Sequence, residues 1–213
     1  MYYEGLGVDQ NYQKAFEWIE QAANQGYANA QFDLGVIYNE GIAVEQDEIK
    51  KLEWFQQAAN QGYTDAQFNL GIMYHESIGI EQDYQKAMQW YLLAANNGSF
   101  DAQNNIGNFY ENGYGVTQDY DKAFEWYTKA ADQGLDVAQL NIGGLYENGY
   151  GVPQDYDKAF EWYKKAAEQG NQEASNRIGR LVINGKIDDT GITIYSTQET
   201  GLTLGYIEDS LRN

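Results

Sequence analysis

The tryptophans of this sequence recur at one fixed spacing, which constrains its fold more than any other feature. The chain has five tryptophans, and each lies 36 residues after the one before it: Trp18, Trp54, Trp90, Trp126 and Trp162. Pairs of alanines follow the same period, and they begin at Ala22, Ala58, Ala94, Ala130 and Ala166. Self-similarity at a period of roughly 20–50 residues is typical of repeat proteins. We therefore expect a row of small stacked units and not one globular core.

The first part of each unit has the pattern of an amphipathic helix. In the segment 101–113, DAQNNIGNFYENG, the apolar residues follow the spacing of one helical face; they are Ala102, Ile106, Phe109 and Tyr110. Gly113 comes directly after this pattern, where a glycine commonly ends a helix. The sequence therefore predicts a helix in this part of every unit.

The second part of each unit predicts another helix. In the segment 118–134, Asp119 is placed to act as the N-cap and Gly134 to end the helix. The buried stripe is expected at Ala123, Phe124, Tyr127, Ala130 and Ala131. The alanines let helices approach closely, and the series of Trp, Tyr and Phe is expected to supply most of the buried area. The tryptophans are thus predicted to be core residues.

The segment ENGYGV occurs twice, at 111–116 and 147–152. Asn-Gly between two alternating strands would indicate a hairpin turn, but helical patterns flank both copies. A phosphate-binding loop would need a preceding strand and a third glycine, and the segment has neither. We expect Gly113 and Gly115 to adopt positive φ values where the chain passes from the first helix to the second.

Taken together, these residues resemble the Sel-one-like repeat, a relative of the tetratricopeptide repeat. In the unit that begins near residue 136, the matching positions are Ala138, Ile142, Gly143, Tyr146, Gly149, Gly151, Val152, Asp155, Lys158, Ala159, Trp162, Tyr163, Ala166, Ala167 and Gly170. The resemblance covers about residues 2–185. It implies an all-α, right-handed superhelical solenoid of helix-turn-helix repeats. It also implies a protein-binding module, of a kind common in bacterial signalling, secretion, envelope assembly and host interaction, and in eukaryotic complexes that assemble around client proteins.

Three positions depart from the repeat pattern. Ser77 and Ala43 stand where loop glycines are expected, so we expect these two joints to be strained or differently curved. Lys51 replaces a small alanine of the second helix. Its long side chain is predicted to extend its ammonium group to solvent.

The repeats divide the chain into four segments. They are a partial first repeat holding a second helix at 1–27, four complete repeats at 28–171, the first helix of a fifth repeat at 172–185, and a divergent cap or tail at 186–213. Tyr2, Gly5, Gly7 and Val8 match the end of a first helix whose beginning is missing. We expect that upstream repeats, and any secretion signal with them, were removed, or that the first helix has an unusual cap.

The tail after residue 185 has a strand pattern, because Ile192, Ile194, Leu202 and Leu204 alternate with a period of two. Three interpretations stay open: a β-hairpin that covers the last helix, a mobile tail, and a strand that binds a partner.

The charge of the chain restricts its partners. The net charge is −19, from 13 Lys and Arg against 32 Asp and Glu, and residues 1–157 hold 24 of the acids and 6 of the bases. Such a chain repels nucleic acid and anionic membrane surfaces. No apolar run reaches the roughly 18–20 residues that span a bilayer. We expect no nucleic-acid partner and no direct membrane insertion, and a protein or peptide partner that is basic or amphipathic.

The sequence contains little material for catalysis. Its one histidine, His75, occupies a position held by Asn39, Glu111 and Glu147 in other units, so it is predicted to be an exposed surface residue. Four aspartates recur because each second helix needs a cap: Asp47, Asp83, Asp119 and Asp155. There are no cysteines, and no cluster of metal ligands. We therefore predict no enzyme activity, no cofactor and no metal site.

The binding surface is expected on the concave face of the array, where the units differ from one another. One variable stripe consists of Phe32, Phe68, Asn104 and Leu140, with Val36, Ile72, Asn108 and Gly144 one turn later. We expect apolar anchor pockets in the first two complete repeats, and hydrogen bonds from Asn104 and Asn108 in the third. The alternative is that Phe32 and Phe68 simply pack against neighbouring helices.

A second series keeps a short polar side chain at one position of the first helix: Asp33, Asn69, Asn105 and Asn141. These side chains could grip an extended peptide by its amides, since Asn both donates and accepts hydrogen bonds. They could equally bond backbone groups between adjacent repeats.

The sequence thus predicts a non-catalytic scaffold or adaptor that binds a partner protein or peptide. The alternative is an inhibitor or immunity protein that neutralises a cognate effector or toxin, since a strongly acidic surface suits a basic target. An enzyme is a third interpretation and would require a pocket with converging titratable groups. The compartment stays open between the bacterial cytoplasm and export.

Overall fold

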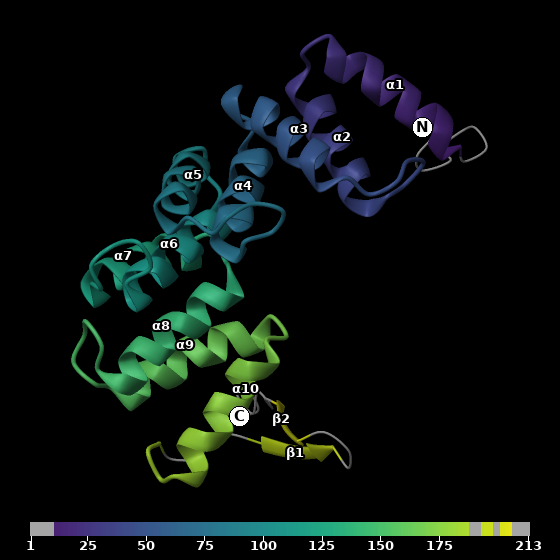
Figure 1. Cartoon of the computed structure of the whole chain (residues 1–213). Coiled ribbons are helices and arrows are strands. Elements are labelled where there is room, and N and C mark those ends of the chain that lie inside the picture. The colour runs from purple at the N-terminus through teal and green to yellow at the C-terminus, as the bar shows by residue number, and fades with distance from the viewer. Residues whose placement is uncertain (1–10, 188–192, 198–200, 206–213) are drawn as a thin grey trace. The chain divides into compact units, whose positions relative to one another are not determined.

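The computed structural model describes residues 11–187, 193–197 and 201–205, and the side chains of residues 11–187. This part of the chain forms ten helices and two strands (Figure 1). The helices are α1 (Tyr12–Asn24), α2 (Ala28–Glu40), α3 (Glu48–Asn60), α4 (Thr64–Glu76), α5 (Tyr84–Asn96), α6 (Phe100–Asn112), α7 (Tyr120–Ala131), α8 (Asp136–Asn148), α9 (Tyr156–Glu168) and α10 (Gln172–Ile183). They fall into two compact units, which are described separately. The first unit contains residues 11–102 and Tyr114–Val116, and the second contains Gln103–Gly113 and the described residues from Thr117 onward.

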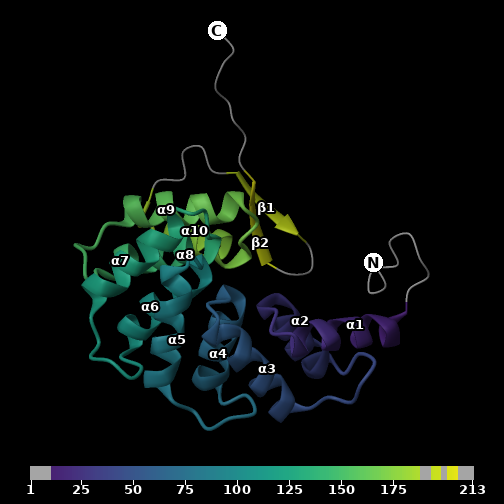
Figure 2. The ribbon, with the colours of Figure 1, turned by 90° about the horizontal axis from the view of Figure 1, so that it is seen from above.

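Two kinds of helix alternate along the chain. The even helices (α2, α4, α6, α8 and α10) are the first helices of the repeats, and the odd helices (α1, α3, α5, α7 and α9) are the second. Helices that follow one another from α1 to α5 lie side by side in the first unit, as do those from α7 to α10 in the second (Figure 2). The prediction of an all-α solenoid of helix-turn-helix repeats is confirmed. No helix within residues 11–187 is both long enough and apolar enough to cross a bilayer.

Four of the odd helices, α3, α5, α7 and α9, begin at the aspartates that the sequence predicts as caps, and α1 begins at Asn11. The Asp119 carboxylate accepts a hydrogen bond of 3.0 Å from the backbone N–H of Lys122, three residues into α7. Asp47, Asp83 and Asp155 do the same for α3, α5 and α9. Each bond satisfies a backbone donor that the first turn of a helix leaves without a partner.

The loops after the even helices place two residues in the left-handed region of φ. Gly113 and Gly115 have φ values of 74° and 65°, as predicted. In the two preceding repeats, Ser77 and Ala43 adopt the same conformation, at 61° and 66°. A residue with a Cβ atom is strained there, so these two joints have the strain that the sequence predicts.

A glycine of each even helix from α2 to α8 receives an aromatic ring of the following odd helix. In the second unit, Tyr163 of α9 is fully buried against Gly143 of α8. A Cβ atom at Gly143 would lie 2.5 Å from two atoms of that ring, whereas carbon atoms in contact are about 3.5–4.0 Å apart. The other pairs are Gly35 with Phe55, Gly71 with Tyr91, and Gly107 with Tyr127. The absence of a side chain on the glycine therefore sets how closely the two helices approach.

The tryptophans are not core residues, which corrects the sequence prediction. Trp18 is 62% exposed, and the other four are half-buried. Trp54 and Trp90 lie against the core of the preceding helix pair in the first unit, and Trp162 does so in the second. For these three tryptophans, the 36-residue spacing marks a contact at the edge between successive helix pairs. Periodicity alone does not distinguish such an edge from the interior.

The two strands lie in the tail. β1 (Thr193–Thr197) pairs antiparallel with β2 (Gly201–Gly205), so that Ile194 is opposite Leu204, and β2 lies beside α10. Ile192 lies outside the described residues. So do residues 1–10, where the sequence predicts the end of a first helix. The function of the tail stays a prediction.

Candidate protein-interaction surface

The residues predicted to contact a partner all lie on even helices and are all half-buried. We call them the even-helix stripe: Phe32, Val36, Phe68, Asn69, Ile72, Asn104, Asn105, Asn108, Leu140 and Asn141. Each of them therefore gives part of its surface to neighbouring residues and part to solvent.

The phenylalanines of the stripe pack against the following odd helix. The ring of Phe32 in α2 stacks on Phe55 of α3 with centres 5.3 Å apart, and it lies 5.1 Å from the ring of Tyr63. Phe68 of α4 lies 5.9 Å from Tyr91 of α5. Aromatic pairs at these distances stabilise helix packing. The interpretation of Phe32 and Phe68 as packing residues is therefore supported, and their contact with a partner stays a prediction.

The asparagines of the stripe make hydrogen bonds inside the protein. In the second unit, Asn141 Nδ2 of α8 donates to Asn104 Oδ1 of α6 over 3.0 Å. In the first unit, Asn69 Nδ2 donates over 2.7 Å to the carbonyl oxygen of Asp65 in its own helix. These bonds support a structural role for Asn69 and Asn141. A role of Asn104, Asn105 and Asn108 toward a partner stays a prediction.

Three members of the stripe in the first unit, Val36, Asn69 and Ile72, meet at a small cavity. Its volume is about 130 Å³, and α3 and the loop after α4 complete its wall. Among the further residues that line it are Ile78 and Lys51. The predicted anchor region of the first two complete repeats therefore contains an actual cavity, which is mainly apolar.

Lys51 does not extend to solvent, which corrects the sequence prediction. It is 2% exposed. Its ammonium group pairs with the Glu48 carboxylate and donates to Asn39 Oδ1 over 3.2 Å. The physical reason is local, because Phe55 of the same helix lacks the hydroxyl group that a tyrosine supplies in the next three repeats. Lys51 provides the polar group that bonds to the even helix in its place.

In the second unit, tyrosine hydroxyls bond to glutamates of the even helices. Tyr127 donates to Glu111 Oε2 over 2.6 Å, and Tyr163 donates to Glu147 Oε2 over 2.5 Å. Burial, together with the neighbouring carboxylate, raises the pKa of both tyrosines well above its usual value. These groups hold their protons at neutral pH and act as structural donors.

His75 takes the same place in the first unit, which corrects its prediction as an exposed residue. Its side chain is half-buried, and Nδ1 lies 3.4 Å from the hydroxyl of Tyr91. The rings of Tyr84 and Tyr114 each lie 5.8 Å from its centre. Burial lowers the pKa of His75, with an opposing effect from Glu76. His75 of α4 thus contacts Tyr91 of α5, as Glu111 and Glu147 contact tyrosines of the following odd helices.

Sequence reasoning missed a row of buried glutamines on the even helices. Each accepts a hydrogen bond from an amide 30 residues later; they are Gln31, Gln67, Gln103 and Gln139. Gln31 and Gln67 also donate to the last turn of the preceding odd helix. The signal was present, because glutamine recurs at this position at the repeat period.

The charged side chains of α2, α4, α6 and α8 are all negative. Helices α2, α4, α6 and α8 contain eight Asp and Glu residues and no Lys or Arg. The lysines at the starts of the odd helices form ion pairs with the cap aspartates; they are Lys50, Lys86, Lys122 and Lys158. The surface of these even helices is therefore anionic beside apolar and amide side chains.

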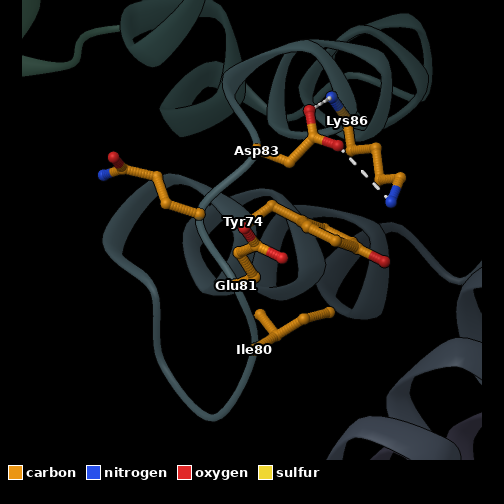
Figure 3. A pocket seen from close by; sticks show the side chains of 6 residues that line it. Tyr74, Ile80, Glu81, Asp83 and Lys86 are labelled. Carbon is orange, nitrogen blue, oxygen red and sulfur yellow. Dashed lines mark hydrogen bonds and ion pairs between the residues drawn. The ribbon is translucent and has the colours of Figure 1, made fainter.

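A second cavity, of about 390 Å³, lies beside the loop after α4, where Tyr74, Ile80 and Glu81 contribute to its wall (Figure 3). Lys86 Nζ lies 3.4 Å from the Asp83 carboxylate and 5.2 Å from the ring centre of Tyr74. The same lysine–tyrosine contact recurs in the neighbouring repeats, so it belongs to the repeat framework. Within residues 11–187, no three His, Asp or Glu side chains gather as metal ligands.

Comparison with solved structures shows close similarity to repeat proteins. A crystal structure of a Sel1 repeat protein from Oxalobacter formigenes is 38% identical with a TM-score of 0.80, and the similarity covers 87% of this chain and 76% of that one. The protective antigen c5321 of uropathogenic Escherichia coli strains is 37% identical with a TM-score of 0.81, but this chain spans only 40% of its length. The immunity protein PA5088 from Pseudomonas aeruginosa is 22% identical with a TM-score of 0.55, a similarity of fold that covers 82% of this chain and 65% of that one.

Comparison with curated proteins gives no match. The family model of the Sel1 repeat matches residues 1–27, 28–63, 64–99, 100–135 and 136–171. These matches agree with the resemblance in the sequence and with the helix pairs of the structure. The chain belongs to the Sel1 repeat family.

Proposed function

We propose that this protein is a non-catalytic interaction scaffold that binds a partner protein or peptide through its even helices. Sel1 repeat proteins are protein-interaction scaffolds. The observation that carries the proposal is made on each of the helices α2, α4, α6 and α8: each has two carboxylates and no Lys or Arg. Half-buried apolar side chains such as Val36, Ile72 and Leu140 accompany them.

This surface favours a basic or amphipathic partner. The negatively charged carboxylates attract a basic partner toward these helices. Apolar side chains such as Val36 and Ile72 then bury apolar surface against the partner. Because most interface energy comes from a few central residues, we expect the apolar part of the stripe to dominate the affinity.

Two double variants test the proposal by capture of partners from a lysate of the native host. In the first, Val36→Asn with Ile72→Asn, both positions receive the residue that the third complete repeat already has at Asn108. The matched control is Ile49→Asn with Leu93→Asn, which changes two exposed apolar residues of odd helices. Both variants should keep their helicity in far-UV circular dichroism. The first should lose the partner and the control should keep it, and the opposite pattern would refute binding through the even helices.

An inhibitor or immunity protein is the second candidate. It is favoured by helices α2, α4, α6 and α8, which carry carboxylates and no Lys or Arg and so suit a basic toxin. The similarity to PA5088 concerns the fold alone. Purification from the native host separates the two candidates, since an immunity protein should bring one dominant, tightly bound partner and a scaffold should bring several.

A further inference from the structure

We propose that the cavity beside Val36 and Ile72 receives one aliphatic side chain of a basic, extended partner segment, and that Lys51 donates a hydrogen bond to a main-chain carbonyl oxygen of that segment. This inference rests on the proposed function, because it specifies the partner chemistry of the same surface. It concerns the first unit only.

The size and the lining of the cavity fit one aliphatic side chain. Its volume is about 130 Å³, and a cavity of about 150 Å³ lined by aliphatic and aromatic groups takes up a molecule the size of benzene. Val36, Ile72 and Ile78 contribute apolar wall, and Ile78 is 36% exposed, so the cavity is reached from solvent on that side. A leucine or isoleucine side chain would fill this space and remove those walls from water.

Lys51 has one donor more than its protein partners use. An ammonium group carries three N–H donors. Among the described residues, Lys51 bonds to the Glu48 carboxylate and to Asn39 Oδ1. The side chain is 2% exposed and lines the cavity. A charged donor that is buried at a binding cavity is stabilised by an acceptor that the ligand supplies.

The acceptor is a carbonyl oxygen and not a carboxylate, because the surroundings of the cavity are already anionic. Glu48 neutralises the ammonium group of Lys51. Helices α2 and α4 add Asp33, Glu40, Asp65 and Glu76 without a base. A second carboxylate would be repelled there, whereas lysine or arginine side chains that flank the anchor would be attracted.

The partner segment is extended, because a helix uses its own carbonyl oxygens in hydrogen bonds along the chain. An extended segment presents carbonyl oxygens and side chains alternately. It can therefore place one side chain in the cavity while a neighbouring carbonyl oxygen accepts from Lys51.

The groups that build this site are particular to the first two complete repeats. The position of Lys51 is occupied by an alanine in the later ones, at Ala87, Ala123 and Ala159. Val36 and Ile72 correspond to Asn108 and Gly144. The other repeats therefore supply natural replacements for testing it.

The test uses the full chain and three synthetic peptides with blocked ends: Lys-Lys-Leu-Lys-Lys, the same peptide with Ser for Leu, and Glu-Glu-Leu-Glu-Glu. Methyl NMR spectra of the isotope-labelled protein report binding at Ile72 and Ile78. The Lys-Leu peptide should shift both methyl signals. The Ser peptide should bind about tenfold more weakly, because the cavity then stays unfilled. The Glu peptide should give no shift at these positions.

Variants separate the roles of the two groups. Ile72→Asn should weaken binding of the Lys-Leu peptide about tenfold, whereas the matched control Leu140→Asn, in the second unit, should not change it. Lys51→Met keeps the length and apolar stem of the side chain, and it should also weaken binding about tenfold through loss of the charged donor. If Lys51→Met does not fold, Lys51→Ala provides the second variant, since three other repeats have alanine there.

The outcomes distinguish this inference from the proposed function. Unshifted Ile72 and Ile78 signals, or unchanged binding to a folded Lys51 variant, would overturn the inference. If the peptide shifts signals of other even helices only, the inference fails while the proposed function stands. If the partner captured from the native host binds equally well to the Val36→Asn, Ile72→Asn variant and loses binding in the odd-helix control, both fail.

Discussion

The fit between Gly143 and Tyr163 gives a sharp test of how the repeats hold together. We consider Gly143→Ala. An alanine in the interior of a helix is favoured over glycine by about 1 kcal/mol, so with free space the change would stabilise α8. The new Cβ atom, however, would lie 2.5 Å from Cδ1 and Cε1 of the fully buried Tyr163 and 3.1 Å from its Cζ. The ring cannot move freely, because its hydroxyl is held by Glu147 over 2.5 Å.

Overpacking of this kind costs about 1–3 kcal/mol. Because the ring would have to shift by about 1 Å to regain normal contact, we take the upper part of that range. Subtracting the gain in helix propensity leaves a net destabilisation of about 1–2 kcal/mol.

Gly179→Ala is the matched control. Gly179 occupies the equivalent position of α10, and a Cβ atom there would meet no atom of the described residues within 4 Å. The control should therefore stabilise the second unit by about 1 kcal/mol through helix propensity alone. Urea unfolding followed by far-UV circular dichroism measures both free energies of unfolding. If Gly143→Ala proves as stable as the unmodified protein, or if the two variants shift stability in the same direction, the close helix approach is not what requires glycine.

Three further predictions concern single residues. Ala43→Gly should raise the free energy of unfolding by about 1 kcal/mol, because it relieves a left-handed conformation at a φ of 66°; a lower urea midpoint would contradict this. The N–H of Lys122 holds the pKa of Asp119 below its usual value, so the contribution of this cap is complete above the unfolded pKa and is lost as the pH falls through the folded one. Asp119→Asn can still cap α7, so in this variant the free energy of unfolding should fall less steeply as the pH is lowered through the acid range. Burial lowers the pKa of His75 below its ordinary 6.5, so stability should decline as the pH falls below about 6.5; His75→Gln should remove this decline, and an increase on acidification would refute it.

Much of the fold follows from local chemistry that the sequence displays directly. Asp119 predicts the start of α7 because a carboxylate there satisfies a backbone donor. Gly113 predicts the end of α6 because glycine adopts positive φ without strain. Signals of this type depend on a few neighbouring residues, so they need no knowledge of the tertiary structure.

Depth of burial was less predictable, because a period states which positions share a face and not how far they lie inside. Trp18 keeps the repeat spacing and is nevertheless 62% exposed. Lys51 carries a charge and is nevertheless buried. The information needed to predict the burial of Lys51 lay in two other positions. Phe55 lacks a hydroxyl group, and Asn39 stands where the third and fourth complete repeats have glutamate. That Lys51 takes over the role of a tyrosine hydroxyl is seen only once its contact with Asn39 is known.

The candidate site was predicted in part. The sequence located Val36, Asn69 and Ile72, and the structure brings these three together at one cavity. It did not reveal that Asn141 is already bonded to Asn104. Hydrogen bonds between repeats join residues that are far apart in sequence, so the choice between a structural and a binding role for these asparagines required coordinates.

Hydrogen–deuterium exchange of the protein, alone and with its co-purified native partner, tests binding through the even helices most directly. The measurement reports which helices the partner protects from exchange with solvent. We predict that protection concentrates on α2 and α4, with weaker protection of α6 and α8. Protection confined to the odd helices would contradict the account.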